Sequence, residues 1–158
     1  MESVQPLVEV PQHLQKGWET IMTTPLETVN FRLQSEGHLD PNTQATAVDE
    51  YRKFLGLILL ENGGFAMTSP EVDEVWHTHI LFTQDYSQFC NAVFGHYLHH
   101  VPNTPMTPSR PGGVARFFGA YRKVFGKLNS IWPSTENMAC KSICGDCGDC
   151  NDYQCSME

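Results

Sequence analysis

Histidine and aspartate side chains that could bind one metal ion are concentrated in the middle of the sequence. Asp73, His77 and His79 lie within seven residues, and His99 and His100 follow about twenty residues later. On a helix, residues four apart share a face, so Asp73 and His77 can point at one ion. His79 would face roughly the other way, and could join His77 only at a helix end or a local distortion. His99 and His100 diverge by about a quarter turn, so we expect only one of them to reach the site.

Imidazoles together with one carboxylate form a ligand set that suits several transition metals. Zinc fits three or four such ligands, whereas two histidines and one carboxylate with open positions suit Fe(II) or Mn. The sequence therefore predicts a transition-metal cofactor, with Zn or Fe favoured, and leaves the identity of the metal open. The alternative is that the histidines are structural and cap helices or bridge carboxylates.

A second candidate metal site is the C-terminal end, which holds five of the six cysteines. Gaps of two and three residues allow neighbouring thiolates to reach one Zn, Cu(I) or iron–sulfur centre. Gly-Asp pairs between the cysteines supply turns and no apolar core, so order would have to come from the ligand. The alternative is a disordered thiol tail that acquires adventitious metal or forms disulfides. The candidate ligands are Cys140, Cys144, Cys147, Cys150 and Cys155.

Amphipathic helices are expected to position the histidines. Apolar residues recur at helical spacing over residues 43–61 and 114–128, and again from Ser69-Pro70-Glu71, a helix start, towards His100. Residues 26–36 fit either a helix or a strand. No sustained alternation that would build a large sheet is present. We therefore expect an all-α fold, with a compact multi-helix domain over residues 1–130 and a Cys-rich, loop-like tail over residues 131–158.

Composition and charge exclude several classes of partner. Ten Lys and Arg against eighteen Asp and Glu give a formal charge of −8, which should repel phosphate backbones and anionic membranes. The most apolar run, residues 54–60, is about a third of a membrane-spanning helix. No secretion signal is visible, and cysteines without a signal peptide favour a reducing compartment. We expect a cytoplasmic protein that binds neither nucleic acid nor membrane.

The Trp-His-x-His string that ends at His79, with Tyr86, Cys90 and the Phe94-Gly95 pair downstream, resembles the glycine-rich domain-containing protein-like family of plants and bacteria. The resemblance covers about residues 47–102. It implies a helical domain of largely unassigned activity and transfers no catalytic residues. The chain lacks the glycine-rich region and the extended C-terminal domains of the longer plant members, so their stress-related or RNA-linked roles are not expected of it.

These patterns lead to one expected function and two alternatives. The expected function is transition-metal binding, with a His/Asp site in a helical body and a thiolate-rich tail that binds, delivers or senses metal. The first alternative is a metal-dependent enzyme, in which an open Fe or Zn site activates oxygen or water. The second is a helical interaction domain with structural histidines, whose aromatic faces bind a protein or peptide partner.

Overall fold

The computed structural model describes residues 4–102, 104–108 and 111–133 of the 158-residue chain. Over these residues the regular structure is helical, and no strand is present beyond an isolated bridge between Thr104 and Thr107. The all-α prediction is confirmed for this part of the chain, whereas the five tail cysteines lie outside it. The elements are the 3-10 helix η1 (Gln12–Leu14) and helices α1 (Gln15–Thr23), α2 (Glu27–Glu36), α3 (Pro41–Glu61), α4 (Pro70–Leu81), α5 (Thr83–Phe94) and α6 (Gly113–Phe125).

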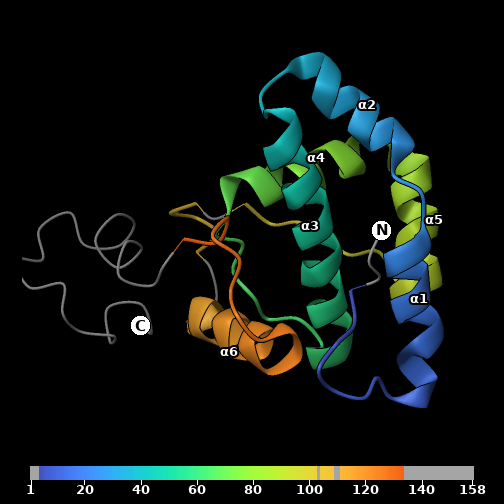
Figure 1. The fold of residues 1–158 in the computed structure, drawn as a ribbon, viewed down its shortest axis with the longest axis vertical. Coiled ribbons are helices and arrows are strands. Elements are labelled where there is room, and N and C mark those ends of the chain that lie inside the picture. The colour runs from blue at the N-terminus through green and yellow to red at the C-terminus, as the bar shows by residue number, and fades with distance from the viewer. Residues whose placement is uncertain (1–3, 103, 109–110, 134–158) are drawn as a thin grey trace, which may run out of the picture.

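Helix α3 is the centre of the molecule and packs against α1, α2, α4 and α6 (Figure 1). It begins slightly earlier than the sequence indicated, because Asp40 is the cap and accepts hydrogen bonds from the backbone N–H groups of Asn42 and Thr43. Pro41 then occupies the first turn, where its missing N–H would have no partner in any case. The helix buries large apolar side chains around its middle, including Tyr51, Phe54, Leu55 and Leu57.

Helices α4 and α5 are two separate helices, since the backbone of Phe82 leaves helical geometry with φ −83° and ψ 66°. The start of α4 follows the prediction: the Ser69 hydroxyl accepts the N–H of Val72, and Pro70 opens the helix. Helix α5 ends at Gly95, whose φ of 74° suits a residue without a Cβ. After this turn the chain returns towards α4, where His100 meets it.

The segment that also fitted a strand forms helix α2, which packs against α3 and α4. It buries Val29 and Leu33, four residues apart, and leaves Phe31 73% exposed. Helical burial therefore explains the pattern better than strand alternation, which would have put Val29 and Phe31 on the same face. The helix ends at Gly37, whose φ of 68° turns the chain back towards α4.

Helix α6 packs against α3, and the two helices together with Trp132 enclose the carboxylate of Glu50. Glu50 is 1% exposed and accepts hydrogen bonds from Tyr121 Oη at 2.9 Å and Trp132 Nε1 at 2.7 Å. Lys53 Nζ lies 2.6 Å from its other oxygen, so the buried charge is paired. Trp132 is 2% exposed and thus part of the helical core, although it follows residue 130. Among the described residues, no helix is long and apolar enough to cross a membrane.

Candidate metal centre

Three potential ligands from the histidine-rich region converge on the exposed side of α4. The nearest pair is His100 Nε2 and Asp73 Oδ1, at 2.6 Å, and His77 Nε2 lies 3.5 Å from the other Asp73 oxygen. One ligand atom from each residue can be chosen so that all three lie within 4.8 Å of one another. Ligand atoms bound to a single ion at about 2.1 Å are at most about 4.2 Å apart, so the fit needs only a small side-chain adjustment. His77, with a side chain 51% exposed, has room to make it.

Helical periodicity explains two of these three positions. Val72, Val75 and Trp76 are buried against the core, which leaves Asp73 and His77 together on the outer side of α4, one turn apart. Asp73 also belongs to the first turn of the helix, where a carboxylate is favoured by the helix dipole. The predicted Asp73 and His77 pair is thus brought together by the fold.

The third position depends on a buried hydrogen-bond relay that holds the segment after α5 against α4. Trp76 Nε1 donates to Tyr86 Oη at 3.0 Å, and Tyr86 Oη donates to the backbone oxygen of Leu98 at 2.6 Å. This relay links α4, α5 and the returning chain two residues before His100. The His100 ring then packs on Trp76, with ring centroids 4.2 Å apart, and its side chain is only 11% exposed. His100 is therefore fixed beside Asp73 by the packing around it.

His99, the adjacent candidate, is not brought to this cluster. It is exposed, and its ring contacts that of Tyr97 at a tilt of 56°, with ring centroids 4.7 Å apart. Only His100 meets Asp73, as expected, but the helical reason for it was wrong: α5 ends at Phe94, so the two histidines do not lie on a helix and the path of the returning chain separates them.

His79 is not brought to the cluster either, because it points into the protein from the other side of α4. Its exposed fraction is 3%, and Nδ1 lies 2.8 Å from Tyr51 Oη. The ring is surrounded edge-on by Tyr51, Tyr86 and Phe89. Burial lowers the pKa of His79 to about 4, partly opposed by Asp85, so the imidazole is neutral at pH 7.

The structure describes one of the six cysteines, Cys90, and leaves the five of the tail outside the described residues. Cys90 is buried in α5, and burial raises the pKa of its thiol, which disfavours the thiolate that binds metal. Cys140, Cys144, Cys147, Cys150 and Cys155 lie outside the described residues, so the predicted thiolate site stays a prediction.

A second cluster of possible ligands was missed from the sequence. Glu36, His38 and Glu74 place one ligand atom each within 4.8 Å of one another, with His38 Nδ1 3.1 Å from Glu74 Oε1. No local spacing signals this group, because it joins the end of α2 to α4 through the turn at Gly37. The side chain of His38 is 63% exposed and that of Glu74 is 33% exposed, whereas His100 in the first cluster is only 11% exposed. The first cluster is therefore better shaped for holding an ion.

Comparison with known proteins corrects the resemblance drawn from the Trp-His-x-His string. Residues 20–119 match the UCP032817-like family, which is uncharacterised, and nothing connects the chain with the glycine-rich domain-containing protein-like family, so that assignment was wrong. The string is too short to identify a family, whereas the match extends over α2 to α5 and most of α6. No curated protein and no solved structure gives a significant match. This chain belongs to the UCP032817-like family.

Proposed function

We propose that the protein binds one divalent transition-metal ion through Asp73, His77 and His100. The observation that carries the proposal is the convergence of two imidazole nitrogens and a carboxylate from two segments more than twenty residues apart. Two histidines with one carboxylate suit Fe²⁺, and also Zn²⁺ when water completes the shell.

Packing around the three side chains supports this role. A ligand bound to metal works best when its orientation is fixed by neighbouring groups, and Trp76 together with the relay through Tyr86 fixes His100 in this way. His77 lies on the solvent side, with ring centroids of the two histidines 4.5 Å apart. That side leaves room for water or a small ligand, and a bound ion would supply Lewis-acid chemistry there.

The test uses the full chain with all five tail cysteines changed to Ser, so that thiolates cannot supply the binding. After loading with Zn²⁺ and dialysis, elemental analysis should find one equivalent of zinc. His77→Ala and His100→Ala should each weaken zinc binding by at least tenfold, because each removes one of three protein ligands.

Two matched variants separate this site from its surroundings. His99→Ala removes the imidazole next to His100, and His38→Ala removes the histidine of the second cluster. Both should retain the zinc held by the parent. Zinc that survives His77→Ala and His100→Ala, or that depends equally on His99, would refute the proposed site. A Cys-free chain that binds no zinc would refute it as well.

A further inference from the structure

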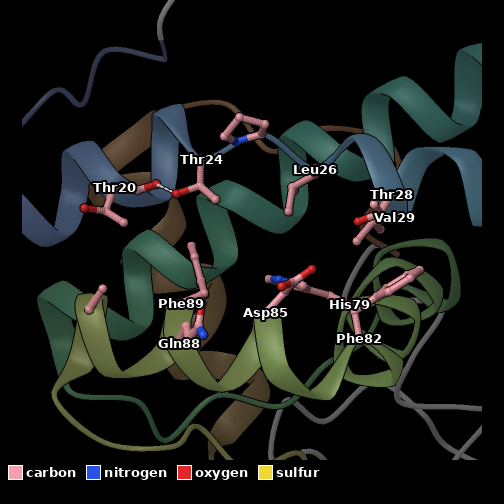
Figure 2. Close-up of a pocket in the computed structure, with 12 residues that line it drawn as sticks. Thr20, Thr24, Leu26, Thr28, Val29, His79, Phe82, Asp85, Gln88 and Phe89 are labelled. Carbon is pink, nitrogen blue, oxygen red and sulfur yellow. Dashed lines mark hydrogen bonds between the residues drawn. The ribbon is translucent and has the colours of Figure 1, made fainter.

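A pocket on the opposite side of α4 from the candidate metal centre is lined by His79. It has a volume of about 320 Å³ and lies between the α1–α2 junction and helix α5. Figure 2 shows His79 and Asp85 on one side of this space, facing Leu26 and Val29 across it. Leu26, Val29, Phe82 and Phe89 supply its apolar walls. The other lining residues include polar ones, Thr20, Thr24, Thr28 and Gln88, so the pocket combines apolar contacts with hydrogen-bonding groups, as a small-molecule site requires.

The hydrogen bond to Tyr51 determines which hydrogen-bonding group His79 presents to a ligand in this pocket. The Tyr51 hydroxyl is fully buried and has no other partner among the described residues, so its proton must go to His79 Nδ1. The neutral ring then carries its own proton on Nε2. No hydrogen bond from that nitrogen is formed within the described residues, and Thr68 Oγ1 is the only buried side-chain polar atom there that is left without a partner. His79 Nε2 therefore reaches accessible space, and the pocket is the space that His79 lines.

The charges of the lining side chains restrict the class of ligand that the pocket can bind. Among the described residues, Asp85 is the only acidic side chain that lines the pocket, and no Lys or Arg does. A carboxylate or phosphate would meet the Asp85 charge without a compensating cation, so anions are disfavoured. An N–H donor on His79 and an acceptor on Asp85 match a group that has a carbonyl oxygen next to an N–H.

We propose that this pocket binds a small, uncharged ring compound carrying an amide group. The carbonyl oxygen would accept from His79 Nε2, the amide N–H would donate to Asp85, and the ring would contact Phe82 and Phe89. The proposal is independent of metal binding, because it uses the inner side of α4 and not the outer one.

The experiment is an NMR titration of the full-length protein with benzamide and, as a matched anion, benzoate. EDTA is present so that benzoate cannot bind through a metal ion. Benzamide should shift the ring signals of His79 in a saturable way, with a Kd in the millimolar range, and benzoate should bind at least tenfold more weakly. Asp85→Asn should narrow this difference at least fivefold, because it removes the charge that repels benzoate.

Two further variants test where benzamide binds, and both change exposed residues outside the buried core. Ala92 lines the pocket from an exposed position of α5, so Ala92→Trp should block benzamide binding. Ser87 is also exposed on α5 and lines no part of the pocket, so Ser87→Trp should leave binding unchanged. The proposal is overturned if benzamide gives no saturable shift, if benzoate binds equally well, or if Ala92→Trp still binds benzamide as the Ser87→Trp control does.

Discussion

Changing Tyr86 to Phe would test whether the buried relay positions His100. The substitution removes one hydroxyl and with it the hydrogen bonds to Trp76 Nε1 at 3.0 Å and to Leu98 O at 2.6 Å. Each is worth about 1 kcal/mol net, and leaving the indole N–H without a partner adds to the loss, so we expect unfolding to become easier by about 2 to 3 kcal/mol. Urea denaturation of the metal-free protein measures this difference.

The same variant should weaken zinc binding, because part of the binding energy would be needed to bring His100 back to Asp73. With about 1 kcal/mol from the bond to Leu98 lost to the ordering of this segment, zinc affinity should fall about fivefold in Tyr86→Phe. Tyr97→Phe is the matched control: Tyr97 packs edge-on against Tyr86, and its hydroxyl forms no hydrogen bond within the described residues. An unchanged zinc affinity in Tyr86→Phe, despite lower stability, would refute the positioning role of the relay.

Three other substitutions follow from packing and burial. Gly56→Ala should destabilise the fold by about 1 to 3 kcal/mol, because a Cβ there would lie 2.8 Å from the Trp18 ring. Gly119→Ala in helix α6 should stabilise the fold by up to about 1 kcal/mol, because the new Cβ would have no described atom within 4 Å. Thermal unfolding of both variants checks these two expectations. His79 has a pKa lowered to about 4 from 6.5, so the unfolded state binds its proton more readily, and the stability that the neutral ring contributes above pH 6.5 is lost as the pH falls towards 4. We expect a loss of about 2 kcal/mol between pH 7.5 and pH 5 in EDTA that is absent from His79→Gln; equal pH dependence of the two proteins would contradict this assignment.

The parts of the site that follow from local periodicity could be predicted from the sequence. Asp73 and His77 are one helical turn apart, and the buried positions Val72 and Trp76 determine which way that turn faces. The same rule separated His79 from His77. The all-α fold was predictable for the same reason, since apolar residues at helical spacing mark most of the buried face of α3.

The remaining parts depend on contacts between distant residues, which spacing does not encode. Whether His99 or His100 meets Asp73 is decided by the path of the chain after Gly95, and that path is held by the bond from Tyr86 to Leu98. Trp132 follows the last periodic segment and still belongs to the core, because Glu50 provides a buried acceptor for its indole N–H.

The relay through Tyr86 also bears on the order in which the fold forms. Its two hydrogen bonds connect residues 10 and 12 positions apart, whereas the bond from Trp132 to Glu50 spans 82 positions. Closing short loops costs less chain entropy than closing long ones, so contacts of low contact order form readily and early. The segment from Asp73 to His100 can thus acquire its geometry as a local unit, before Trp132 reaches Glu50.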